Sequence, residues 1–185
     1  MSRHTLIGDD FLLIVQDTLG HEKGYIHDPA DPGGETNFGI SKRSYPHLDI
    51  KNLTREQAIE IYYRDFWLKP KISQLEDFAL ARRLFDLGVN CGPATAIKML
   101  QRAVNTVCAG TVSPERRAAW RQTIVRLLHG KTLRVDGQIG PITLGVIKAC
   151  PYPVAMKTAL RGEAYIHYKK GNPLYIPGWL LRLSA

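Results

Sequence analysis

Residues 21–40 read HEKGYIHDPADPGGETNFGI. From His27 to Gly39 this stretch is crowded with Asp, Pro, Gly and Asn, which supply fixed or positive φ angles and self-bonded turns rather than a helical ladder. Before it, apolar residues recur at helical spacing over residues 7–19. The sequence therefore predicts a helix that ends near Gly20, followed by a loop or a short hairpin.

Helical signals continue through the rest of the chain. Thr54 followed by Gln57 is a capping-box pattern, so a helix should start near Arg55. Proline, glycine and capping residues delimit further helices. These are expected from Phe78 to Leu87 with an end near Gly88, from Pro93, from Ser113, within Val135–Lys148, and from Pro153 to Lys169. Because strand-type alternation is scarce, we expect a mainly helical fold with at most a small β-hairpin near the Gly-rich loop.

Composition bounds the class of protein. The 185 residues are 44% hydrophobic and 23% charged, which is ordinary for a folded soluble chain. The formal net charge of +8 favours polyanionic partners, namely nucleic acid, anionic membranes or anionic wall polymers, although it also serves solubility alone. No helix-turn-helix, zinc or RNA-binding motif accompanies the charge, so we expect no nucleic-acid partner.

The cysteines and the first residues bear on the compartment. Cys91, Cys108 and Cys150 are an odd set without metal-ligand spacing, so we expect free thiols and no metal. Residues 1–10 carry polar and acidic side chains where a signal peptide needs a basic and then an apolar region. The longest uncharged apolar run is far too short to span a bilayer. We therefore expect a soluble protein of a reducing cytosol.

Several carboxyl groups lie in and beside the Gly-rich loop. Glycoside cleavage needs an acid that protonates the leaving oxygen and, usually, a second carboxylate. Glu22 follows the expected end of the first helix, where the negative end of the helix dipole and partial burial beside Tyr25 would raise the pKa of its carboxyl group. A raised pKa suits a general acid near neutral pH. For the second carboxylate, composition does not choose Asp31 over Asp28 or Glu35, and a loop with several acids is commonly a solvated turn.

Four stretches resemble glycoside hydrolase family 108, the N-acetylmuramidases of phage and prophage endolysins. These are His21–Tyr25, Asp28–Ile40, Phe85–Gly92 and Asp136–Pro141. The resemblance implies a lysozyme-like helical fold, cleavage of peptidoglycan, and Glu22 as the catalytic acid. Lys23 replaces the family's first glycine and places a positive charge next to that acid. No cofactor is implied, because proton transfer and electrostatics suffice for this cleavage.

A more distant similarity, to phage-type lysozymes, ranks the loop acids. Glu22, Asp31 and Thr36 nearly reproduce the spacing of the catalytic Glu, Asp and Thr of those enzymes, with one residue fewer between Asp31 and Thr36. Asp31 and Thr36 would then position or activate a water on the opposite face of the sugar. That arrangement predicts hydrolysis with inversion.

A glycan cleft also needs aromatic platforms flanked by amides and carboxylates. The residues that we expect to bind substrate are Tyr25, Asp28, Asn37, Tyr62, Trp67 and Asn90. The aromatic and amide members of this set have an equally weighted structural interpretation, as core aromatics or helix-capping amides.

The resemblance also implies an organisation and a setting. We expect a catalytic region over residues 1–104 and a helical peptidoglycan-binding region over 105–185 that packs on it. An endolysin would accumulate in the cytosol as a monomer and reach the periplasm and cell wall through a holin-type membrane pore. The alternatives are a lytic transglycosylase, which needs one carboxyl group and leaves an anhydro-sugar, and a wall-binding or secretion-associated protein that does not cut.

Overall fold

The computed structural model describes residues 8–20, 24–27, 34–109, 122, 126–129, 131–171 and 176–184. Contacts within the chain form two compact units, one up to Lys69 and one from Pro70. Each unit is described by itself below. The functional division into residues 1–104 and 105–185 stays a prediction.

The first unit begins with helix α1, Asp9–Gly20, which ends at the predicted residue. Its buried face includes Phe11 and Val15. The ring of Phe11 lies 5.0 Å from the ring of Tyr63 and 5.5 Å from the ring of Trp67, measured between centroids. This aromatic cluster fixes α1 against the second helical segment of the unit.

Three short strands follow α1. They are β1 (Ile26–His27), β2 (Glu35–Asn37) and β3 (Ile40–Ser41). The strands form one antiparallel sheet in the order β1-β2-β3, and β2 and β3 make the small hairpin that the sequence predicted. Ile40 is buried and anchors the hairpin to the core.

Helix α2, Arg55–Ile61, begins where the capping box predicted. The backbone N–H of Gln57 donates to Thr54 Oγ1 at 3.2 Å, and the backbone N–H of Thr54 donates to Gln57 Oε1 at 2.9 Å. The helix continues without a break into a π-helix, η2, Tyr62–Leu68. π-Helical turns are rare and occur frequently at functional sites.

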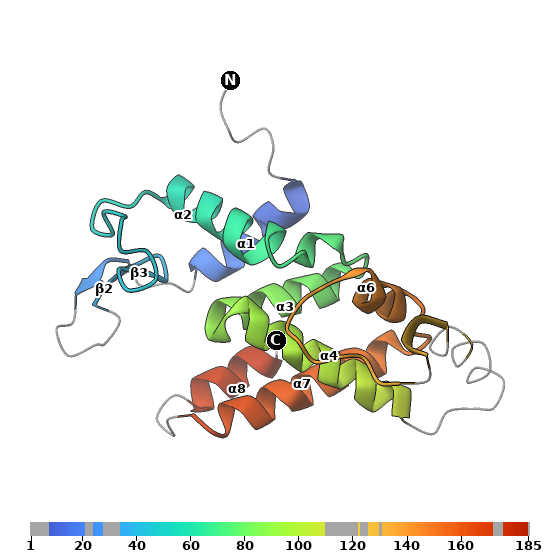
Figure 1. Ribbon diagram of the computed structural model, residues 1–185. Coiled ribbons are helices and arrows are strands. Elements are labelled where there is room, and N and C mark those ends of the chain that lie inside the picture. The colour runs from blue at the N-terminus through green and yellow to red at the C-terminus, as the bar shows by residue number, and fades with distance from the viewer. Residues whose placement is uncertain are drawn as a thin grey trace. The chain divides into compact units, whose positions relative to one another are not determined.

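The second unit is helical in its described part. Its elements are η3 (Ile72–Gln74), α3 (Phe78–Cys91), α4 (Pro93–Ala109), α6 (Pro141–Lys148), α7 (Pro153–Tyr168) and α8 (Ile176–Ser184). Helix α4 packs against both α3 and α7, and α8 packs on α7 (Figure 1). Pro93 and Pro153 open their helices as predicted. The start of the helix expected from Ser113 lies outside the described residues.

The predicted end of α3 near Gly88 is wrong. The helix continues to Cys91, and Gly92 ends it with a φ of 84°, a value that favours glycine. Gly88 lies inside the helix at a buried position, where a Cβ atom would meet Pro93 Cα at 3.5 Å, an ordinary van der Waals distance.

The Asp136–Pro141 motif is held by one buried amide of α4. Gln101, only 1% exposed, donates from Nε2 to Asp136 Oδ1 at 2.8 Å and to the carbonyl of Gln138 at 3.0 Å. Its Oε1 accepts from the backbone N–H of Gly137 at 2.9 Å. Gly137 has a φ of 80°, and a Cβ there would lie 2.9 Å from the carbonyl oxygen of Ala94. The motif is therefore a turn docked tightly on a helix.

These elements confirm the predicted fold class, a mainly helical lysozyme-like fold with a small sheet beside the Gly-rich loop. Among the helices of the described ranges, none has the length and apolar character needed to span a bilayer.

Candidate active site

The three loop carboxyl groups central to the sequence-based mechanism, Glu22, Asp28 and Asp31, lie outside the described residues. Their assignments stay predictions. The structure describes the segments of the chain on either side of them. Glu22 comes two residues after the end of α1, and Asp31 comes four residues before the start of β2.

Thr36, the third predicted catalytic residue, lies in the centre of β2 and is half-buried. Its partners in the sheet are Ile26 on β1 and Ser41 on β3. A residue at the middle of a central strand is held by ladders on both sides. The main chain at Thr36 is therefore held in place on both sides, and a catalytic hydroxyl requires such a fixed attachment.

A tight turn follows Thr36. Phe38 and Gly39 connect β2 to β3, and both have positive φ angles, 50° and 73°. Two-residue hairpin turns of type I′ require positive φ at both central positions. Phe38 is not a glycine, so its conformation carries strain that its surroundings must offset.

Two predicted substrate-binding residues supply those surroundings. Asn37 is only 6% exposed, and its Nδ2 donates to the carbonyl of Ile50 at 3.1 Å and to that of Leu53 at 3.4 Å. The hydroxyl of Tyr62 donates to the carbonyl of Phe38 at 2.9 Å. Together they tie the hairpin to the loop before α2 and to the π-helix. This geometry favours the structural interpretation of both side chains, and their contact with substrate stays a prediction.

Tyr25 and Trp67 differ in exposure. Tyr25 is 39% exposed, next to Ile26 at 45%, so its ring is available at the surface of the sheet. Desolvation and then the negative charges of Glu35 and Asp49 raise the pKa of Tyr25. Trp67 is only 9% exposed and packs on Phe11. Of these two rings, Tyr25 is the more exposed, and the binding of sugar by either ring stays a prediction.

Asn90 lies in the last turn and a half of α3, in the second unit. Its Nδ2 donates to the carbonyl of Asp86 at 2.8 Å, one turn earlier in the helix. This bond orients the amide along its own helix. The substrate-binding role of Asn90 stays a prediction.

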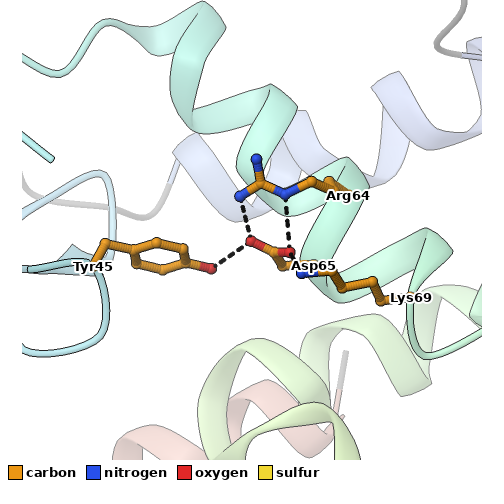
Figure 2. Close-up of polar contacts among 4 residues, drawn as sticks. All are labelled: Tyr45, Arg64, Asp65 and Lys69. Atoms are coloured by element: carbon orange, nitrogen blue, oxygen red, sulfur yellow. Dashed lines mark hydrogen bonds and ion pairs between the residues drawn. The ribbon is translucent and has the colours of Figure 1, made fainter. Parts of the chain in front are cut away.

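A cluster centred on Asp65 escaped the sequence-based prediction. Arg64 donates from Nε to Asp65 Oδ1 at 3.0 Å and from Nη2 to Asp65 Oδ2 at 2.6 Å (Figure 2). Lys69 Nζ lies 2.7 Å from Asp65 Oδ1. The hydroxyl of Tyr45 donates to Asp65 Oδ2 at 3.0 Å. The Asp65 side chain is 13% exposed. The spacing of Asp65 and Lys69 on a helix signals their ion pair, but no sequence signal joins Tyr45 to a residue 20 positions away.

The cluster has strong electrostatic consequences. Hydrogen bonds from Arg64, assisted by Lys69 and Tyr45, hold the pKa of Asp65 far below its ordinary range even though partial burial opposes them. Burial, followed by the hydrogen bond to the Asp65 carboxylate and its charge, raises the pKa of Tyr45 to about 12. Asp65 therefore stays ionised near neutral pH and does not suit proton transfer.

Within the described ranges, no group of three or more His, Cys, Asp or Glu side chains is placed to hold a metal ion. The three cysteines are free thiols, as predicted.

Comparison with known protein families identifies a match to the segment that contains the end of α1 and the hairpin. Residues 15–92 match the family model described as glycosyl hydrolase 108. The matched segment includes Glu22 and the whole hairpin.

Among solved structures, the chain is similar to the structure of SagA from Brucella abortus, with a TM-score of 0.69 and 24% sequence identity over 94% of this chain and 89% of that one. At this identity, the likeness concerns the fold. Among curated proteins, no sequence matches. The resemblance inferred from the motifs is confirmed for residues 15–92, the part of the chain that is similar to the glycosyl hydrolase 108 family.

Proposed function

We propose that this protein is an N-acetylmuramidase that hydrolyses the β-1,4 bond between N-acetylmuramic acid and N-acetylglucosamine in peptidoglycan, with Glu22 as general acid. The observation that carries the proposal is the glycosyl hydrolase 108 match over residues 15–92. This match supports a glycoside hydrolase that acts on peptidoglycan. The basic charge of the chain suits an anionic wall polymer.

The proposed mechanism assigns one role to each candidate. Glu22 follows the C-terminal end of α1, where the helix dipole disfavours a carboxylate and so favours the protonated acid. The acid gives its proton to the bridging oxygen as the glycosidic bond breaks. Asp31 and Thr36 would orient a water for attack from the other face, with inversion as the outcome. The hairpin bonds of Asn37 and Tyr62 support this proposal, because they hold the strand that carries Thr36.

The decisive experiment compares wild type with Glu22→Gln, which keeps the size of the side chain and removes its acidic proton. We expect the variant to lose the clearing of permeabilised bacterial cells while still binding isolated cell walls. Glu76→Gln is the matched control, because Glu76 is 68% exposed and pairs with an equally exposed lysine. Unchanged lysis by Glu22→Gln would remove the proposal.

The products discriminate between related activities. Mass spectrometry of the released muropeptides should show added water, as hydrolysis requires. Anhydro-sugar ends would instead indicate a lytic transglycosylase. Wall binding without any released product would indicate a wall-binding protein.

We also propose the setting of an endolysin, in which the enzyme stays in the cytosol as a monomer until a holin-type pore admits it to the wall. Expression with and without a membrane-permeabilising agent tests this, since lysis should depend on the agent. Analytical ultracentrifugation tests whether the protein is a monomer in solution. A wall-binding role for residues 105–185 is best tested in the full chain, because α4 spans Pro93–Ala109 and a cut at residue 104 would break it.

A further inference from the structure

A groove of about 440 Å³ lies in the first unit, between the loop before α2 and the helix itself. Its apolar lining includes Leu53 and Ile61, both at most 7% exposed. Its charged lining consists of Asp49, Glu60 and Arg64. The volume falls in the range of small-ligand sites.

The two acidic residues enter the groove from different elements. Asp49 lies on the loop, where the backbone N–H of Asn52 donates to its Oδ1 at 3.2 Å and Asn52 Nδ2 donates to its Oδ2 at 2.9 Å. These bonds lower the pKa of Asp49, so its charge persists at neutral pH. Glu60, half-buried, lies on α2, one helical turn before Arg64.

The carboxylate of Asp65 holds the guanidinium group of Arg64 in place. Two hydrogen bonds, from Nε and Nη2, fix the plane of the guanidinium group, and its third nitrogen is directed away from the carboxylate (Figure 2). The Arg64 side chain remains 57% exposed. Lys69 also pairs with Asp65, so these three residues together keep one net positive charge. These bonds therefore fix the orientation of a cationic side chain that lines the groove.

The charges of the lining decide which ligand fits. Asp49 and Glu60 with Arg64 sum to one net negative charge, which disfavours a polyanion. A neutral sugar hydrogen-bonds to such groups but neutralises none of their charges, and a purely cationic ligand leaves the charge of Arg64 unmatched. A ligand that carries both a carboxylate and an amine on an aliphatic chain matches all three charged residues and the apolar lining.

We propose that this groove binds the peptide stem of peptidoglycan through a stem carboxylate on Arg64 and a free stem amine on Glu60 and Asp49. The inference rests on the proposed function and adds a second point of recognition beside the glycan. Arg64 is the specificity-determining residue for the carboxylate. Leu53 and Ile61 contact the aliphatic part of the stem.

The binding test uses a synthetic stem tetrapeptide that carries a diamino acid with a free side-chain amine and a free C-terminal carboxylate. Titration into ¹⁵N-labelled protein should shift the backbone amide signals of Asn52, Gln57 and Glu60. Glu60→Gln and Arg64→Met should each weaken binding about two- to fivefold, as exposed ion pairs do. Lys148→Met is the matched control, because Lys148 is 69% exposed, pairs with an exposed glutamate and does not line the groove, and its affinity should equal that of wild type.

Acetylation of the stem amine provides a further discriminating measurement. The capped peptide should bind more weakly to wild type, and the difference in affinity between capped and uncapped peptides should be smaller for Glu60→Gln, which keeps only Asp49 to pair with the amine. Absence of shifts in the groove, or equal affinity of wild type and both variants for the uncapped peptide, overturns the inference.

Separate measurements test the stem-binding inference and the proposed hydrolase function. Loss of cell lysis in Glu22→Gln decides the hydrolase, and peptide shifts in the groove decide the stem site. With glycan strands as substrate, Glu60→Gln should raise KM about two- to fivefold on strands that carry stems and leave KM on stem-free strands unchanged. An equal rise on both substrates would contradict stem recognition.

Discussion

The hydroxyl of Tyr62, in the first turn of the π-helix, donates to the main-chain carbonyl of Phe38 at 2.9 Å. Phe38 is the non-glycine member of a turn in which both residues have positive φ. The bond thus holds a strained turn, and the turn fixes the register of the strand that carries Thr36. A core aromatic of the helical segment controls the geometry of the sheet.

Tyr62→Phe tests this bond, because it keeps the buried ring and removes only the donor. We expect the free energy of unfolding to fall by about 1 kcal/mol, measured by urea denaturation. Tyr165→Phe is the control, since Tyr165 is 48% exposed on α7 and its change should lie within about 0.5 kcal/mol of wild type. Equal stability of Tyr62→Phe and wild type would show that the bond does not hold the turn.

Asn37→Asp tests the second tie of the hairpin. An ionised carboxylate has no hydrogen to donate, so it would face the carbonyls of Ile50 and Leu53 unfavourably. We expect a loss of about 2–3 kcal/mol at pH 7. Burial raises the folded-state pKa of the new acid above its unfolded value, so the loss should shrink as the pH falls and the protonated acid regains one donor. A loss that is independent of pH would contradict this role.

Asp65→Asn should change how stability depends on pH. The pKa of Asp65 is lower in the folded than in the unfolded state, so its contribution is complete above about pH 5 and declines as the pH falls below that value. We expect wild type to exceed the variant by about 1–3 kcal/mol at pH 7, and the gap to narrow towards pH 3. Urea unfolding at several pH values measures it. Glu76→Gln should show no such trend, because its ion pair is exposed.

Two glycine-to-alanine substitutions in the second unit should act in opposite directions. Gly137→Ala should lower the melting temperature and cost about 2 kcal/mol or more, since φ is positive and the new Cβ would meet the carbonyl of Ala94. Gly162→Ala lies inside α7 with no atom within 4 Å of the new Cβ, so it should stabilise by about 0.5–1 kcal/mol. A Gly137→Ala protein as stable as wild type would refute the docked turn.

The thiols should be slow to react in the folded protein. Burial raises the pKa of Cys91 and of Cys108 to about 11, and it also raises that of Cys150. At pH 8 the thiolate fraction of the first two should be roughly a hundredfold lower than in the unfolded chain. Absorbance of a chromogenic disulfide reagent, with and without urea, checks this. A rapid phase in native protein would show an accessible thiolate.

Local signals in the sequence were sufficient where neighbouring residues alone decide the outcome. The capping box at Thr54, the proline starts of α4 and α7 and the end of α1 at Gly20 each depend on a few adjacent residues, and each prediction is confirmed. Gly88 misled the prediction of the end of α3, because a glycine is tolerated inside a helix at a modest cost and this one lies at a buried position within α3.

By itself, the sequence determined the helical fold class, the hairpin beside the Gly-rich loop and the glycoside hydrolase resemblance, because periodicity, turn residues and motifs are written in adjacent positions. Only the tertiary structure decided that Asn37 and Tyr62 face backbone carbonyls and that Tyr45 reaches Asp65. Amides and aromatic rings serve sugars and cores equally well. Which of the two they serve depends on burial and on partners distant in the chain, and both arise only when the chain has folded.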